Sequence, residues 1–284
     1  MKMIFKIIGL IVLMIIVCIT VLSLLNLTNR NYHRLVDHHL SLESSAQPQT
    51  ITNDDLSHLP DLIQNYLNYV GIVGTEHVSN FRILFDGGMK MDKDKKFSPF
   101  TAEQTTFVNQ GVRLFYMDMH LNGLKVSGLH HFDDEDARMK IKLLDVFPVV
   151  NEHGESMQQA ETVTFFNDMV LFAPQTLIDA HIEWEKTGEY QMKATFTHEG
   201  ITVEAALVFT EDGRLINFIS NDRLALETDG LTSSVPWSTP ITEYEEINGL
   251  TLPKTGHATW HYDDGEFTYI TLNVLDVTFN VDQE

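Results

Sequence analysis

Histidine and acidic side chains are the groups in this sequence that could bind a metal ion. The chain has 13 histidines, but His130 and His131 are consecutive and would point to opposite faces of a strand. His257 and His261 would share one face of a strand, about 13 Å apart at 3.3 Å per residue. Zinc sites commonly use cysteine pairs or an H-E-x-x-H helix, and neither occurs in the sequence. The spacing therefore favours no metal site, and only a zinc site assembled from distant strands is left open.

Calcium needs several oxygen ligands around a tight loop. Two acidic segments of the sequence have some of these ligands. Asp92, Asp94 and Glu103 have part of the spacing of a calcium loop. Phe97, however, stands where such a loop needs glycine. The four consecutive acids at 133–136 are typical of a solvated loop between two strands. Neither segment predicts a calcium site.

Catalytic motifs are absent from the sequence, which has no G-x-S-x-G, no phosphate-binding glycine loop and no dinucleotide fingerprint. The one cysteine, Cys18, lies in the apolar N-terminal run, so the rest of the chain has neither a thiolate nucleophile nor a disulfide. Asp212-Gly213 and Asp263-Asp264-Gly265 are acidic residues followed by glycine, a pattern that is typical of hairpin turns. We therefore expect a protein that is not an enzyme and that needs no cofactor.

Methionine is the residue type whose placement indicates binding. Beyond the N-terminal run, methionines fall in apolar registers of predicted strands or on a predicted helix, where they either fill gaps in an ordinary core or line a pocket for a flexible hydrophobic ligand. The candidate ligand-binding residues are Met89, Met91, Phe115, Met117, Met119, Met139, Phe166, Met169, Arg223 and Trp260. Arg223 has two interpretations: it pairs with a carboxylate such as Glu103 or Asp168, or it binds an anionic head group.

Antiparallel strands must position most of these residues. Short runs that alternate apolar and polar residues are separated by turn signals, which predicts a meander rather than βαβ units. The predicted strands cover about 81–91, 101–108, 112–121, 124–132, 137–149, 181–186, 190–197, 201–210, 215–221, 237–247, 250–253, 256–262 and 267–281. Asn248-Gly249 predicts a two-residue hairpin. Pro253 cannot donate to a neighbouring strand, so we expect it at an edge or a bulge.

Two helices are predicted to cover the sheet. The first runs from Pro60 to Gly71, since proline suits a first turn and glycine a C-terminal cap. The second opens with the capping-box pattern at 156–159, continues to about Phe172 and stops before Pro174. Its residues are too apolar for a helix with a solvated face, so it should be enclosed.

The N-terminal run Ile7–Leu25 is almost uninterrupted in apolar character and, at 1.5 Å per residue, is about as long as the hydrocarbon layer is thick. No A-x-A-like site follows it, and the bulky residues at 15–17 do not suit lipoprotein processing at Cys18. An uncleaved anchor is therefore favoured over a cleaved signal peptide. The flanking basic residues are nearly balanced, and the long domain that follows favours a single-pass protein of the cell membrane whose C-terminal domain is extracytoplasmic.

Charge separates the anchor from the rest of the chain. The net charge is −21, and residues 1–34 contain four basic and no acidic residues, so the remainder carries −25. An acidic domain repels nucleic acid and anionic bilayer surfaces, and neither is expected as a partner. We predict an anchor at 1–34, a polar linker at 35–53 and a single domain at 54–284.

Several segments resemble an uncharacterised bacterial family of membrane-anchored proteins, which is known only as a domain of unknown function. They are Pro99–Gln104, Leu144–Val150, Phe166–Met169, Asp222–Arg223 and Trp237–Pro240. The end of the chain, with Tyr244, an Asn-Gly turn, Leu-Pro and a final Asp-Val-Thr-Phe-Asn, more distantly resembles the curved half-barrel of periplasmic lipoprotein carriers. The first resemblance implies no established activity, and the second implies a curved antiparallel sheet.

The predicted fold is mainly β (α+β), a large curved antiparallel sheet with two covering helices, preceded by one transmembrane helix. The predicted function is that of a membrane-anchored, non-enzymatic domain that binds a lipid or acyl group on the concave face, with one or both helices as a plug. The alternative is a cell-envelope interaction module with a filled core, in which Trp237 and Trp260 face a protein partner.

Overall fold

The computed structural model describes residues 6–9, 11–15, 26–43, 49–133, 136–226 and 232–282. Much of the predicted membrane run 7–25 lies outside these ranges, and the described parts of that run are helical. Among the described residues, no helix combines the length and the apolar character needed to cross a membrane.

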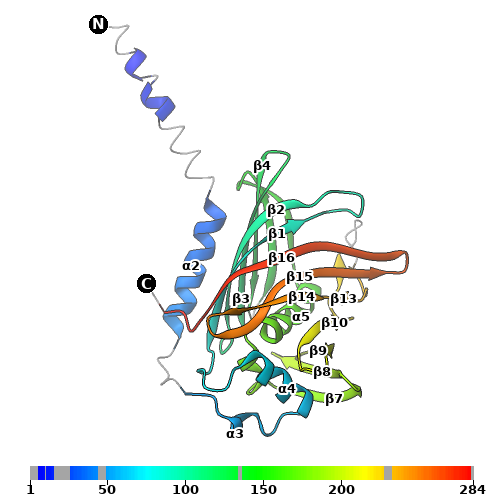
Figure 1. Cartoon of the computed structure of the whole chain (residues 1–284). Coiled ribbons are helices and arrows are strands. Elements are labelled where there is room, and N and C mark those ends of the chain that lie inside the picture. The colour runs from blue at the N-terminus through cyan, green and yellow to red at the C-terminus, as the bar shows by residue number, and fades with distance from the viewer. Residues whose placement is uncertain are drawn as a thin grey trace.

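Fourteen strands in the described part of the chain form one antiparallel sheet. They are β1 (Asn80–Met89), β2 (Ser98–Phe107), β3 (Val112–Leu121), β4 (Leu124–Phe132), β5 (Ala137–Leu143), β6 (Phe147–His153), β7 (Ile182–Gly188), β8 (Gln191–His198), β9 (Ile201–Phe209), β10 (Leu215–Ser220), β13 (Trp237–Ser238), β14 (Ile241–Ile247), β15 (Leu250–Tyr262) and β16 (Gly265–Phe279). The short strands β11 (Ala225–Leu226) and β12 (Thr232–Ser233) pair separately. Figure 1 shows the strong curvature of the large sheet.

The strand order is β6-β5-β4-β3-β2-β1-β16-β15-β13-β10-β9-β8-β7, with β14 paired to β15. The chain therefore builds one arm outward from β1 to β6, crosses to the opposite edge, and returns inward from β7 to β16. The first and last strands of the sheet pair with each other, with Phe81 opposite Phe279 and Met89 opposite Ile270. This topology confirms the predicted curved antiparallel sheet.

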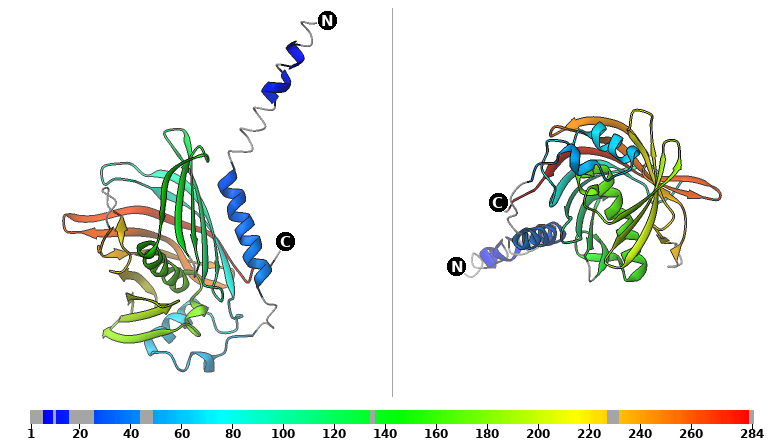
Figure 2. Two further views of the ribbon diagram at one scale, coloured as in Figure 1. Left: turned by 180° about the vertical axis from the view of Figure 1, so that it is seen from behind. Right: turned by 90° about the horizontal axis from the view of Figure 1, so that it is seen from below.

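Helices cover both faces of the sheet. They are α2 (Leu27–Leu42), α3 (Asn53–Leu56), α4 (Asp61–Val70), α5 (Glu155–Phe172) and the 3₁₀ helix η1 (Pro174–Leu177). Helix α5 lies on the concave side, and α2 lies on the outer face of β3 and β4 (Figures 1 and 2). The two predicted helices are α4, which is followed by Gly71 with a φ of 87°, and α5, which ends two residues before Pro174. The capping box predicted at 156–159 is wrong, because α5 already begins at Glu155 after Gly154 and has no side-chain cap.

Helix α2 was not predicted, and the expected linker at 35–53 begins inside it. The helix forms because Tyr32 and Val36, one turn apart, share a buried face. This face packs on the outward side chains of the sheet, which are Phe107, Val112, Leu114, Tyr116 and Leu129. Strand β3 is thus buried on both faces, by α2 outside and by α5 inside.

Several strand boundaries also differ from the prediction. The segments expected at 250–253 and 256–262 form one strand, β15, and the segment expected at 237–247 is divided into β13 and β14. The single strand expected at 137–149 is two strands, β5 and β6, because Leu144 and Asp145 adopt φ values of 53° and 62° and reverse the chain. Strand β1 ends at Met89, so Met91 does not continue its apolar register and is 68% exposed. The expected irregularity at Pro253 is confirmed, since the pairing of β14 with β15 shifts register between Glu243 and Tyr244, opposite Pro253.

Candidate functional site

Helix α5 is enclosed by the sheet. Every residue from 160 to 172 is buried, whereas a helix on a protein surface buries only one stripe. The helix contacts β5 and β6 in one arm of the sheet and β9 in the other, as well as β15 between them. It thus occupies the concave space in which a ligand would lie.

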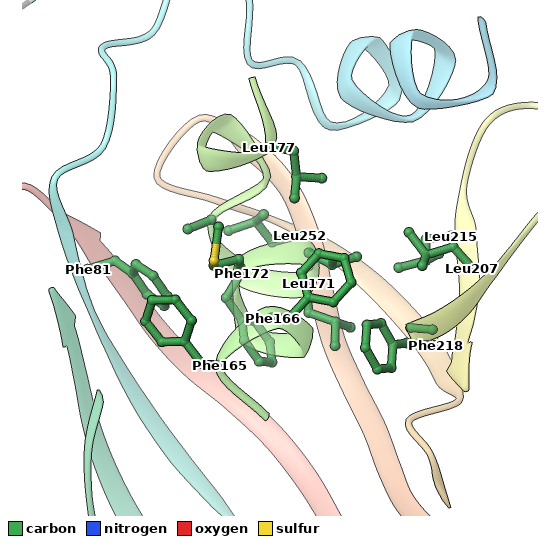
Figure 3. Packing of buried hydrophobic residues seen from close by; sticks show 14 of the residues in the cluster. Phe81, Phe165, Phe166, Leu171, Phe172, Leu177, Leu207, Leu215, Phe218 and Leu252 are labelled. Carbon is green, nitrogen blue, oxygen red and sulfur yellow. The ribbon is translucent and has the colours of Figure 1, made fainter. Parts of the chain in front are cut away.

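Aromatic rings join α5 to the second arm of the sheet. Phe166 stacks on Phe196 of β8 with ring centroids 4.7 Å apart, and it meets the ring of Phe218 of β10 edge-on at 5.5 Å (Figure 3). On the other side of the helix, Phe165 lies 5.8 Å from Phe132 of β4. Large apolar side chains on both arms therefore hold the helix in place.

A buried polar network holds α5 to the first arm, and Arg113 of β3 is at its centre. The Arg113 Nε–H donates to Asp168 Oδ2 at 2.7 Å, and one Nη group donates to Glu161 Oε2 at 3.0 Å. The other Nη group donates to Gln104 Oε1 of β2 at 2.8 Å. Glu161 and Asp168 lie two helical turns apart, so both face the arginine from one side of α5.

Further hydrogen bonds complete the network. His130 Nδ1 of β4 lies 2.8 Å from Glu161 Oε1, and the Gln104 side-chain amide donates to Asp168 Oδ2 at 2.9 Å. The Asn167 amide donates to Asp168 Oδ1, and Thr239 donates to the Asn167 carbonyl oxygen. The carboxylate oxygens of both acids are therefore satisfied within the protein.

The network keeps its groups charged despite their burial. Burial by itself raises the pKa of Glu161, but His130 and Arg113 outweigh it and lower that pKa to about 2. Burial likewise acts to lower the pKa of Arg113, while Asp168 and Glu161 raise it. Because the oxygens of both carboxylates accept hydrogen bonds from protein donors, the arrangement is suited to fixing α5 rather than to proton transfer.

Arg223 does not form the ion pair that the sequence suggested. Its Nε–H donates to Thr164 Oγ1 at 3.2 Å, and its guanidinium lies 4.7 Å from the ring centroid of Trp237 and 5.3 Å from that of Trp260. Asp168 is instead held by Arg113. The two tryptophans are 3% and 8% exposed, so the expectation that they face a protein partner is wrong.

The predicted site residues divide by burial, and most of them surround α5. Those buried in the core cluster are Met117, Met119, Phe166, Met169 and Trp260. Those half-buried are Met89, Phe115, Met139 and Arg223, whereas Met91 is exposed beyond β1. The structure thus brings nine of the ten into the interior or its margin, and their role in binding a ligand stays a prediction.

The polar members of the interior were missed from the sequence. Arg113 is separated from Phe115 and Met117 by two and four residues, so the alternation of a strand places this cation on the same face as those two candidate ligand-binding residues. Glu161 is a charged residue within a helix that was expected to be enclosed. A search for charged residues at strand and helix positions that are predicted to be buried would have found Arg113 and Glu161, but it would not have shown that they form an ion pair.

A small cavity of about 160 Å³ opens beside the first half of α5. It is lined by Phe132, Asp133, Gln158, Thr162, His198, Glu199 and Ile201. The rings of Phe132 and His198 lie 5.8 and 5.1 Å from the ring of Phe165. The opening therefore leads from solvent to the aromatic side chains that pack on the helix. Among the described residues, no group of three His, Cys, Asp or Glu side chains is placed to hold a metal ion.

The two arms of the sheet meet close to this opening. Gly111, in the turn between β2 and β3, has a φ of 67°, and a Cβ atom at this position would lie 2.4 Å from the ring of His198. A side chain at Gly111 would therefore be strained by the positive φ and would displace the ring of His198.

Solved structures with similar folds include proteins of the lipoprotein-carrier group. A putative outer membrane lipoprotein-sorting protein domain from Vibrio parahaemolyticus is 11% identical, with a TM-score of 0.44 over 72% of this chain and 87% of its own. A DUF1329 family protein from Desulfovibrio piger is 11% identical, with a TM-score of 0.44 over 79% of this chain and 92% of its own. A LolA superfamily protein from Nitrosomonas europaea is 10% identical, with a TM-score of 0.38 over 78% and 93%. Likeness at this level indicates nothing about function.

Sequence comparison places the chain more specifically. No curated protein matches it. A family model matches residues 49–272, which include all of the large sheet up to β16, helices α3 to α5 and the buried network. Because this match covers most of the chain, the protein belongs to the family of unknown function DUF6544.

Proposed function

We propose that this protein is a membrane-anchored, non-enzymatic domain that binds the acyl chain of a lipid on the concave face of its sheet, in exchange for helix α5. The observation that carries the proposal is the complete enclosure of α5 by the sheet. A curved sheet that accommodates a helix has room for a chain of similar width once the helix moves. The arrangement with α5 in the concave space is then the closed state.

The side chains around α5 suit a flexible hydrophobic ligand. Met117 and Met119 of β3 face the helix, and Met169 lies on the helix itself. Thioether side chains change shape at little cost, so this surface can repack around either a helix or an acyl chain. The cavity beside Phe132 and Thr162 provides an entry at the margin of the helix.

The connections of α5 suit a movable element. It follows the edge strand β6 through Gly154, whose φ is 96°, and it leads through η1 to the opposite edge strand β7. Its network of buried charges adds less net stability than apolar side chains of equal volume would. The network does, however, restrict the positions that α5 can take against the sheet. Such a helix has one defined closed position and is released when the network opens.

Membrane attachment comes from residues 7–25 in this proposal, with the domain outside the cytoplasm. The run has the length and apolarity of a membrane span, and α2 begins directly after it. An anchored domain would take lipids from, or hold them near, the membrane that carries it.

The test is cross-linking of a photoactivatable fatty acid to the full-length protein in phosphatidylcholine nanodiscs. We expect cross-links within β3 at 112–121 and faster amide hydrogen exchange in α5 when lipid is bound. The double variant Glu161→Gln/Asp168→Asn should increase the cross-linking, because it weakens the network that holds α5. Lys186→Gln, on the far edge strand, serves as the control. Cross-links confined to residues 7–25, with unchanged amide hydrogen exchange in α5, would contradict the proposal. They would favour the alternative function, an interaction module whose core is filled by protein.

A further inference from the structure

A second candidate site lies on the outer face of the sheet, in a groove between α2 and strands β4 and β5. Its volume is about 500 Å³. The lining residues are Leu27, Thr28, Arg30, Asn31, Arg34, Leu129, Lys140 and Lys142. The groove is separated from the concave interior by the sheet itself.

Four of the lining side chains are cations. Arg30 and Arg34 lie one helical turn apart on α2, and Lys140 and Lys142 lie two residues apart on the outward face of β5. None of the four forms an ion pair within the described part of the chain, where the ion pairs involve other residues. Arg34 donates only to the Asn31 side-chain oxygen, at 2.6 Å. A chain with a net charge of −21 thus has a groove with four cations that form no ion pair among the described residues.

The groove lies beside the start of α2, the helix that follows the predicted membrane run in the sequence. The backbone N–H of Thr28 donates to both carboxylate oxygens of Asp145 at 3.3 Å, and Lys125 Nζ donates to the Asn26 side-chain oxygen at 3.1 Å. These bonds tie the start of α2 to the turns at one end of the sheet. The first turn of α2, which follows residues 7–25 in the sequence, therefore lies beside the groove.

The turns at this end carry exposed apolar side chains. The β3–β4 turn and the β5–β6 turn are neighbours, since Val126 pairs with Leu143 and the Leu144 N–H donates to the Lys125 carbonyl oxygen. The exposed side chains on these turns and at the start of β6 are Leu121, Leu124, Val146, Phe147 and Val149, between 40% and 59% exposed. Apolar side chains next to uncompensated cations are the combination that an interface with anionic lipid requires.

We propose that this groove binds the phosphate of an anionic phospholipid in the membrane that residues 7–25 enter. The inference rests on the membrane attachment proposed above, but not on the acyl ligand of the concave face. Arginine binds phosphate oxygens in a bidentate manner, and the two lysines add point charges on the opposite wall. The exposed apolar turns contact the acyl region. Charge averaged over the sequence gave no sign of this site, because its two halves are more than a hundred residues apart.

The test is binding of short-chain phosphatidylglycerol to the full-length protein, measured by native mass spectrometry, with short-chain phosphatidylcholine as the neutral probe. We expect preference for phosphatidylglycerol, and a loss of its affinity on the order of 30-fold in Lys140→Gln/Lys142→Gln, since each cation near an anionic lipid contributes about fivefold. The control Lys186→Gln/Lys193→Gln removes the same charge from β7 and β8, at the opposite edge of the sheet, and should leave affinity unchanged.

Three outcomes would overturn the inference: equal binding of both lipids, equal loss in the two double variants, or competition by inorganic phosphate at the concentration of the lipid, which would identify a site for free anions. Thermal unfolding of each variant shows that affinity is compared between folded proteins. Failure of the acyl-ligand proposal is seen separately, in the cross-links on the concave face, and failure of the anchor is seen as full-length protein that does not enter nanodiscs.

Discussion

Arg113 shows how far the sequence predicts single residues of the interior. Strand parity places it beside Phe115 and Met117, and this placement is correct. Its partners, Glu161 and Asp168, lie 48 and 55 residues further along the chain. Which cation meets which carboxylate depends on how the sheet curves around α5, and local patterns contain no such information. For this reason the sequence suggested Arg223, rather than Arg113, as an ion-pair partner of Asp168.

The first prediction concerns Arg113→Met. This change leaves two buried carboxylates without their cation, and we expect the free energy of unfolding to fall by about 3 to 5 kcal/mol. Urea denaturation measures the loss. The variant Arg113→Met/Glu161→Gln/Asp168→Asn removes all three charges together and should recover a large part of it. A single variant as stable as the wild type would show that the network contributes nothing to the closed state.

The second prediction concerns acid. Glu161 has a pKa of about 2 in the folded protein against 4.5 for an ordinary glutamate, so the unfolded chain takes up a proton first as the pH falls. Its contribution to stability, on the order of 3 kcal/mol, is therefore complete above pH 4.5 and is lost between about pH 4.5 and 2. Unfolding free energies of wild type and Glu161→Gln measured across this range should converge towards low pH. Glu185→Gln, on an exposed position of β7, should run parallel to the wild type.

At the scale of elements, local signals predicted most strands and the two helices α4 and α5. Asn248-Gly249, Gly71 and Pro174 end or reverse elements where expected. Helix α2 was missed because most of its surface is polar and only Thr28, Tyr32 and Val36 are buried, which is too weak an apolar stripe to stand out in the sequence. The reversal at Leu144 and Asp145 was missed because leucine rarely adopts positive φ, and only tertiary contacts such as the bonds from Thr28 to Asp145 stabilise it.

The third prediction tests the docking of α2. Tyr32 is fully buried, packs on Tyr116 at 5.9 Å and exchanges a hydrogen bond with Thr105. Tyr32→Ala should cost about 3 to 5 kcal/mol and should speed hydrogen exchange in α2 while exchange in α5 stays slow. His33→Ala, at the neighbouring exposed position, is the matched control. Equal protection of α2 in both variants would mean that the helix does not depend on this contact.

At the scale of the whole molecule, the sequence predicted a mainly β domain with a curved sheet, and the family to which it belongs, but it left open whether the interior is filled by protein or by a ligand. An enclosed helix and a ligand-binding cavity require the same apolar registers on the facing strands. Met117 and Met119 fit both, so their pattern could not decide between a plug and a pocket. In the structure, α5 connects the edge strands β6 and β7 and occupies the interior of the curved sheet.

The fourth prediction is that the full-length chain sediments with membranes and resists extraction by high salt, because residues 7–25 provide an apolar span. A variant that lacks residues 1–25 has no apolar span, so only the positive groove can hold it to anionic lipid. High salt should therefore release this variant from the membranes. Fractionation followed by immunodetection measures both. Full-length protein in the salt-soluble fraction would refute the anchor.

The pairing of β1 with β16 has a consequence for biosynthesis. The two strands at the centre of the sheet are separated by almost the whole domain in sequence, with Phe81 opposite Phe279. During translation, each arm can form its hairpins early, but the central ladder waits until the last strand has been made. A nascent or prematurely terminated chain that ends before Gly265 therefore presents β1 and β15 as open strands, which are sites for aggregation and for recognition by chaperones or proteases.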